Sequence, residues 1–336
     1  MAEPDTPRNA RVLQRALGSN LIGLLLIIVL FVVLFGTLTD GFLSRFNLYN
    51  IGRVAAIDIV IGFSMMVVLA TGGLNLAVGA IGVSAAMFGG LVMQDLGIPV
   101  LPALALVLAF GALLGGLNGL AMVLTGVHSF IITLATMSLY FGAMITLTRA
   151  QPYNQLPADF VDFAKIRMFG FVSPLLLVTL AAGLLLGWLF RFTAFGREAL
   201  AAGANEKAAG LSGIRVGRMF VYCHALSGTL AALAGLMVSM RNGAALPSMA
   251  GQIGADWLLP AFLAPVIGGT LLTGGTISVT GTALGAILVT VLTSGLLLLQ
   301  VGEFWVQAFL GLILLVAVTL DRVRTVIAER RRVFAR

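Results

Sequence analysis

The stretch Leu21–Gly36, LIGLLLIIVLFVVLFG, carries no charged residue and decides the class of fold. With its flanks it forms an apolar run over residues 20–38, which approaches the ~20 residues that an α-helix needs to cross a bilayer. Arg8, Arg11 and Arg15 precede it, as in a signal peptide, yet no A-x-A-like cleavage site follows. We therefore expect an uncleaved first transmembrane helix.

The rest of the chain has the same character. Of 336 residues, 60% are hydrophobic and only 10% are charged, with a mean hydropathy of +1.07. Soluble domains have about 45–50% apolar and ~25% charged residues, so this chain lacks the polar residues to cover a water-facing surface. The apolar runs are continuous rather than alternating, which disfavours a transmembrane barrel. We predict an all-α polytopic membrane protein of about ten spans, near residues 20–38, 54–71, 76–94, 100–125, 128–148, 171–190, 217–240, 257–273, 277–300 and 304–320.

Basic residues set the orientation. Three arginines lie before the first span, five Lys and Arg lie between spans six and seven, and six arginines lie between Arg322 and Arg336. By the positive-inside rule all three regions are cytoplasmic, which requires an even number of spans before the central loop and an even number after it. Six and four spans satisfy both conditions. The domains are then a cytoplasmic tail (1–19), one transmembrane domain (20–320) with a cytoplasmic loop at about 191–218, and a basic cytoplasmic tail (321–336).

Several kinds of chemistry are disfavoured. One cysteine, Cys223, and two histidines, His128 and His224, suggest no metal site, no cofactor and no catalytic residue. No G-x-x-x-x-G-K motif is present, so ATP hydrolysis would need another chain. The net charge of +7 reflects topology rather than nucleic-acid binding. Asp58, placed near the outer end of the second span, is expected to be interfacial or hydrogen-bonded rather than a proton relay.

The 41 glycines have two expected roles. G-x-x-x-G spacings at Gly111/Gly115/Gly119, Gly183/Gly187 and Gly281/Gly285 favour close helix packing. Paired glycines at 72–73, 268–269 and 274–275 interrupt apolar runs, as backbone that lines a cavity does. Segments 72–90 and 268–285 look alike, which suggests an internal repeat. A path for a neutral solute is predicted from glycines, amides and hydroxyls, although hydrogen bonds between helices would explain the polar ones equally well: Gly72, Gly73, Asn75, Ser84, Asn118 and Thr133.

The central loop TAFGREALAAGANEKAAGLSGI (193–214) suits a docking element. Residues 198–202 can form one helical turn that Gly203 and Ala204 break. Asn205 can then cap a second short helix from Glu206 that ends at Ser212–Gly213. The residues expected to couple the chain to a separate ATPase are Arg197, Glu198, Gly203, Asn205, Glu206, Lys207, Gly210 and Gly213.

The external loop over residues 149–170 mixes charges and prolines. A loop of this kind is by default a solvated connector. The alternative is a docking rim for an external binding protein, for which the candidates are Arg149, Asp159, Asp162, Lys165, Arg241 and Asp256.

Four blocks of the sequence resemble the permease subunits of ribose-type (monosaccharide) importers of the ATP-binding-cassette (ABC) class, a family that includes branched-chain amino acid permeases. They are ATGGLNLAVGAIG (70–82), GGLNGLAMVLTGVHSFIITLATM (115–137), the central loop (193–214) and VIGGTLLTGGTISVTGTALGAIL (266–288), and AVTLDR (317–322) also fits. At Asn75 this family commonly has Asp.

The resemblance implies a type II importer fold in a bacterial inner membrane. It also implies an ABC ATPase, a periplasmic solute-binding protein, a second permease copy or paralogue, and contact with membrane lipid. The expected function is ATP-driven import of a sugar or sugar-like neutral solute. The alternatives are a self-contained facilitator or secondary carrier, or an ABC permease for nucleosides or branched-chain amino acids.

Overall fold

The computed structural model describes residues 20–249 and 251–334, and this part of the chain is almost entirely helical. The elements in chain order are α2 (Asn20–Leu38), α3 (Arg45–Leu69), α4 (Val78–Gly90), the π-helical η1 (Leu91–Asp95), α5 (Val100–Thr125), α6 (Ser129–Thr148), α7 (Ala158–Phe163), α8 (Pro174–Phe192), α9 (Ala194–Ala204), α10 (Glu206–Leu211), α11 (Val216–Asn242), the 3₁₀ turn η2 (Gln252–Trp257), α12 (Leu258–Ile267), α13 (Val279–Leu298) and α14 (Glu303–Phe334).

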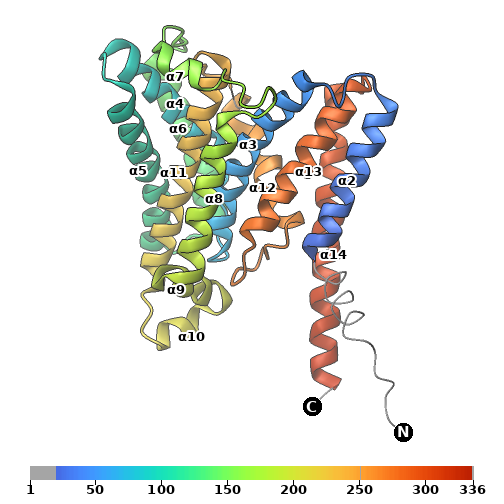
Figure 1. Cartoon of the computed structure of the whole chain (residues 1–336). Coiled ribbons are helices and arrows are strands. Elements are labelled where there is room, and N and C mark those ends of the chain that lie inside the picture. The colour runs from blue at the N-terminus through green and yellow to red at the C-terminus, as the bar shows by residue number, and fades with distance from the viewer. Residues whose placement is uncertain (1–19, 250, 335–336) are drawn as a thin grey trace.

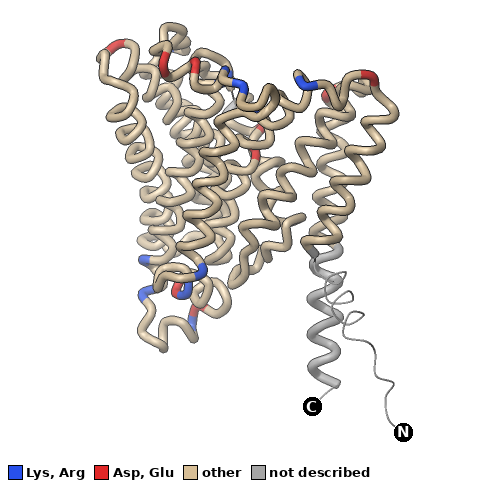
Figure 2. Tube along the Cα trace, in the orientation of Figure 1, with Lys and Arg blue, Asp and Glu red and all other residues tan. Residues whose placement is uncertain are grey.

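The predicted polytopic helical fold is confirmed. In the described part of the chain, eight helical segments are long and apolar enough to cross a membrane, and Gly254–Ile267 and Glu303–Thr319 are shorter apolar segments. Together they match the ten predicted runs. α9, α10 and the C-terminal half of α14 lie at the same end of the bundle (Figure 1), which agrees with one cytoplasmic side. Charged residues gather at the two ends and leave a nearly bare belt between them (Figure 2).

Burial separates central helices from peripheral ones. About 72% of the apolar window of α3 is buried and 67% of that of α11, against 17% for α2 and 22% for α5. The exposed faces of the peripheral helices carry large side chains such as Leu30, Leu124 and Leu184. Because apolar surface in a membrane faces lipid rather than water, these helices form the lipid-facing ring around α3, α4 and α11.

Small residues bring α5 and α11 together. A Cβ on Gly115 would overlap the carbonyl of His224, and one on Gly119 would stand 2.7 Å from the Cα of Val221. This is the close backbone approach that G-x-x-x-G spacing predicts. A Cβ on Gly281 would overlap the carbonyl of Gly268, directly after α12, and one on Gly285 would overlap the carbonyl of Ala264 within α12. The prediction of close helix packing is wrong for the pair at 183 and 187, since a Cβ placed on Gly187 would have no neighbouring atom within 4 Å.

Three other expectations need correction. The eighth span is not helical to residue 273, because α12 ends at Ile267 and irregular backbone follows to Ser278. Asp58 is not near a helix end, because α3 already begins at Arg45. The predicted C-terminal tail continues α14 as helix to Phe334. The predicted N-terminal tail, residues 1–19, lies outside the described residues.

The outer loop 149–170 is more than a solvated connector. It contains α7, whose Phe160 is 1% exposed, and the hydroxyl of Tyr49 on α3 donates a 2.7 Å hydrogen bond to the carbonyl of Ala164. Tyr153 pairs with Ala245 through two backbone hydrogen bonds. Burial raises the pKa of the Tyr153 phenol, and the nearby Asp95 carboxylate raises this pKa further. The loop is therefore packed onto the outer end of the bundle.

Candidate functional site

The central cytoplasmic loop folds into two short helices. Thr193 caps α9 by accepting a hydrogen bond from the amide of Gly196 (3.4 Å), and Asn205 caps α10 by accepting from the amide of Ala208 (3.0 Å). The cap at Asn205 confirms the predicted second helix. The predicted break at Gly203 is wrong, since α9 runs unbroken from Ala194 to Ala204. The chain turns at Asn205, whose extended backbone separates the two helices.

Gly203 lies where α9 meets the two glycine-rich breaks of the membrane domain. A Cβ there would overlap the carbonyl oxygen of Ala70 and stand 2.7 Å from the amide nitrogen of Gly275. A Cβ on Gly274 would in turn stand 2.7 Å from the amide nitrogen of Gly72 and 3.0 Å from the carbonyl oxygen of Gly203. We call Ala70, Gly72, Gly203, Gly274 and Gly275 the glycine junction.

The glycine junction brings the two similar segments into contact. Gly72 (φ +75°), Gly274 (φ +86°) and Gly275 (φ +81°) all adopt the left-handed conformation that favours glycine. This contact does not test the suggested internal repeat. It does show that Gly203 packs inside this chain, so the expectation that it faces a partner is wrong.

The face of α9 and α10 that points away from the bundle is exposed on the cytoplasmic side, where a partner could bind. Arg197, Glu206, Lys207, Gly210 and Gly213 are exposed, and Glu198 is half-buried. Among the described residues, a Cβ placed on Gly210 or Gly213 would have no atom within 4 Å apart from those of its chain neighbours and its own helix.

Sequence analysis missed Leu211 on this surface. Its side chain is 91% exposed at the end of α10, away from the apolar belt. A partner that covered α10 would remove this apolar side chain from water. The sequence gives no local signal that distinguishes Leu211 from Leu200 of the same loop.

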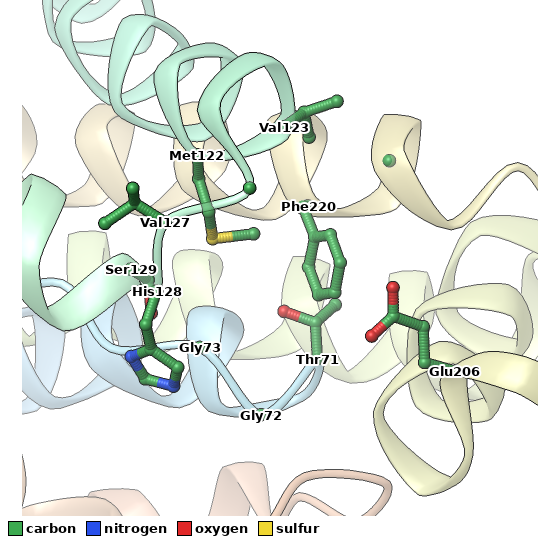
Figure 3. A pocket seen from close by; sticks show the side chains of 12 residues that line it. Thr71, Gly72, Gly73, Met122, Val123, Val127, His128, Ser129, Glu206 and Phe220 are labelled. Atoms are coloured by element: carbon green, nitrogen blue, oxygen red, sulfur yellow. The ribbon is translucent and has the colours of Figure 1, made fainter.

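A cavity of about 350 Å³ lies between α10 and the first glycine break. Figure 3 shows Thr71, Gly72 and Gly73 on one wall, His128 and Ser129 at the start of α6, and Glu206 of α10 beside Phe220 of α11. We call it the cytoplasmic cavity. His128 caps α6, since its Nδ1 accepts a 3.2 Å hydrogen bond from the amide of Phe130.

Hydrogen bonds hold the break between α3 and α4 in place. The hydroxyl of Ser129 accepts from the amide of Leu74 (2.9 Å), and that of Thr133 accepts from the amide of Leu76 (3.1 Å). Asn75 is fully buried: its Nδ2 donates to Ser227 Oγ (2.9 Å), and its Oδ1 accepts from the amide of Ala77 (3.1 Å). These side chains form hydrogen bonds with backbone amides of the break, which have no partner within a helix.

The six predicted path residues do not line one cavity. Gly72 and Gly73 line the cytoplasmic cavity, whereas Asn75 and Thr133 support the break behind it. Ser84 lines a separate apolar groove with Tyr140. Asn118 is buried and accepts a 2.8 Å hydrogen bond from the Tyr140 hydroxyl.

The predicted docking residues fall into two sets. Arg149, Asp159, Asp162 and Lys165 are exposed at the outer end, where Lys165 and Asp162 form a 2.9 Å ion pair. Arg241 does not belong to this exposed rim, because it is only partly exposed and lines a cavity that Asp256 also borders.

No group of three or more His, Cys, Asp or Glu side chains that could hold a metal ion occurs in the described part of the chain.

Comparisons with known proteins bear on the family of this chain. Residues 47–318 match the family model described as "Branched-chain amino acid transport system / permease component". The chain is 36% identical over 297 residues to the ribose import permease protein RbsC of Bacillus subtilis, which covers 87% of this chain and 89% of that protein. It is 31% identical to RbsC of Escherichia coli K12 (88% and 92% covered), and 32% identical to the autoinducer 2 import system permease protein LsrC of E. coli HS (93% and 90% covered).

A comparison with solved structures gives no match. The family model nevertheless spans most of the chain, and the relatives match along nearly their whole length. The expected resemblance is confirmed. This chain therefore belongs to the family of branched-chain amino acid transport system permease components, together with the ribose and autoinducer 2 import permeases.

Proposed function

We propose that this chain is the membrane-spanning subunit of a bacterial inner-membrane ABC importer for a sugar or sugar-like neutral solute. A separate ATPase hydrolyses ATP, a periplasmic binding protein delivers the solute, and a second permease copy or paralogue completes the complex. The chain itself carries out no covalent chemistry.

The glycine junction is the observation that carries this proposal. α9 and α10 expose charged side chains and Leu211 on the cytoplasmic side, while Gly203 contacts both glycine breaks through backbone atoms alone. A displacement of α10 would be transmitted to the membrane domain through backbone contacts rather than through flexible side chains. Such contact between packed rigid elements is a physical route for coupling.

The named relatives favour a sugar-like solute. Two of those cited above import ribose, and one imports autoinducer 2. The description of the family model favours branched-chain amino acids instead. We prefer the sugar because the relatives that carry a ribose name match most of this chain.

Reconstitution tests the proposal against a self-contained facilitator. The permease, with and without its ATPase, is placed in nanodiscs for ATP hydrolysis and in liposomes for uptake. We expect the loaded binding protein to stimulate ATP hydrolysis, and uptake to require ATP. Uptake by the permease alone would support a facilitator and overturn the importer.

A further inference from the structure

A second cavity, of about 660 Å³, opens at the opposite, outer side of the bundle. We call it the outer cavity. It is formed by α3, α13 and α14 together with the start of α12 and the end of α11. Its polar lining residues are Asn50, Asp58, Arg241, Asp256, Thr290, Thr293, Ser294, Glu303 and Gln307. Its volume falls in the range of small-molecule sites.

Asp58 lies deep in this cavity, halfway along α3. The Thr290 hydroxyl donates a 2.8 Å hydrogen bond to its Oδ2, and the side chain is partly exposed to the cavity. In the described part of the chain Asp58 makes no direct ion pair with Arg241, although both line this cavity. A carboxylate at this depth is costly and marks a functional site by default.

Uncharged polar groups lie near that carboxylate, in a wall that also contains the charged Arg241, Asp256 and Glu303. Asn50 lies two turns before Asp58 on the same face of α3, and Thr293 and Ser294 lie one turn after Thr290 on α13. Among the described residues, the side chains of Asn50, Thr293 and Ser294 form no hydrogen bond within the chain. All three side chains are half-buried in the wall, so their polar atoms are free for a ligand.

We infer that the outer cavity is a binding site for one polyhydroxylated neutral solute within a single chain, with Asp58 as its main acceptor. The inference rests on the proposed function and adds to it a solute site outside the predicted glycine path. A hydroxyl-rich solute supplies a donor to Asp58, and donors or acceptors to Asn50, Thr293 and Ser294. Polar groups that a ligand covered without pairing them would cost free energy.

A zwitterionic amino acid is the competing ligand. Its ammonium group would face Asp58 and its carboxylate Arg241, and apolar residues such as Val54 and Leu259 would contact its side chain. The polyol is favoured because an amino acid would leave the unpaired amide and hydroxyls of the wall without partners.

Cysteine protection tests the inference. Thr293→Cys is introduced in a Cys223→Ala background, with Gln155→Cys as the control on the exposed outer loop. The full complex in nanodiscs is treated with a membrane-impermeant methanethiosulfonate, alone and with D-ribose, D-galactose or L-leucine. We expect a sugar to slow modification at position 293 by roughly tenfold, because a ligand in such a pocket covers most of its wall. Modification at position 155 should not change.

The outcomes separate the two proposals. Protection by leucine alone, or by none of the solutes, would overturn the polyol site. ATP hydrolysis is measured on the same samples with loaded binding protein. If stimulation of ATP hydrolysis persists but no solute protects the cysteine at position 293, the importer proposal is supported and the proposed site in the outer cavity is overturned. If stimulation is absent from the Cys223→Ala parent, the proposed function itself fails.

Discussion

The amide of Gly275 donates a 3.0 Å hydrogen bond to the carbonyl oxygen of Ala70. This bond joins the loop after α12 directly to the C-terminal end of α3, and Gly203 of α9 packs against the same carbonyl. Three segments far apart in the sequence thus meet through backbone atoms. A displacement of α9 therefore acts on both breaks at once.

Gly203→Ala should uncouple the permease. The added methyl group would overlap the Ala70 carbonyl, and overpacking of this kind costs about 1–3 kcal/mol. We expect reduced stimulation of ATP hydrolysis by the loaded binding protein. Gly187→Ala on α8 is the matched control, because no neighbouring described atom lies within 4 Å of a Cβ placed there. Equal activity of the two variants would show that the junction plays no part in coupling.

Leu211→Ala should weaken binding of the ATPase. Loss of an interface anchor costs about 1–2 kcal/mol, or roughly a 5- to 30-fold rise in Kd. Leu124→Ala removes the same atoms from a leucine that is 75% exposed at the end of α5. Titration of the ATPase into nanodiscs measures both affinities. If the two variants bind equally well, Leu211 is not an anchor.

Asn75→Ala should destabilise the permease rather than change its selectivity. The substitution leaves the buried amide of Ala77 without its acceptor and removes the donor to Ser227, at a cost of about 1–3 kcal/mol. Asn154→Ala, in the exposed outer loop, is the control. Thermal unfolding in detergent measures the difference, and an unchanged Tm for Asn75→Ala would contradict this role.

Gly115→Leu should prevent α5 from packing on α11. Its side chain would run into the carbonyl of His224, in an interface with no room for side chains. We expect little folded protein on size-exclusion chromatography. We expect Gly142→Leu to fold normally, because a Cβ placed on Gly142 would have no neighbouring atom within 4 Å. Monodisperse Gly115→Leu protein would count against the packing argument.

Local signals in the sequence identified part of this molecule. Apolar run lengths predicted the spans, basic clusters predicted the sidedness, and the capping preference of Asn205 predicted α10. Contacts between distant segments could not be predicted in this way. Nothing local shows that Gly203 packs against Ala70, or that Asp58 and Thr290 share a hydrogen bond across 232 residues. The start of α3 at Arg45 was missed because polar residues in its first turns hide a helix that extends beyond the apolar run.

The short α12 has a consequence for the surrounding lipid. Its ten residues rise only about 15 Å, half the thickness of the hydrocarbon core, before irregular backbone begins at Gly268. Thr273 and Thr276 in that segment are exposed, and acyl chains cannot hydrogen-bond to such backbone. The annulus of lipid around this chain is therefore interrupted at α12, where water or another protein surface must take its place.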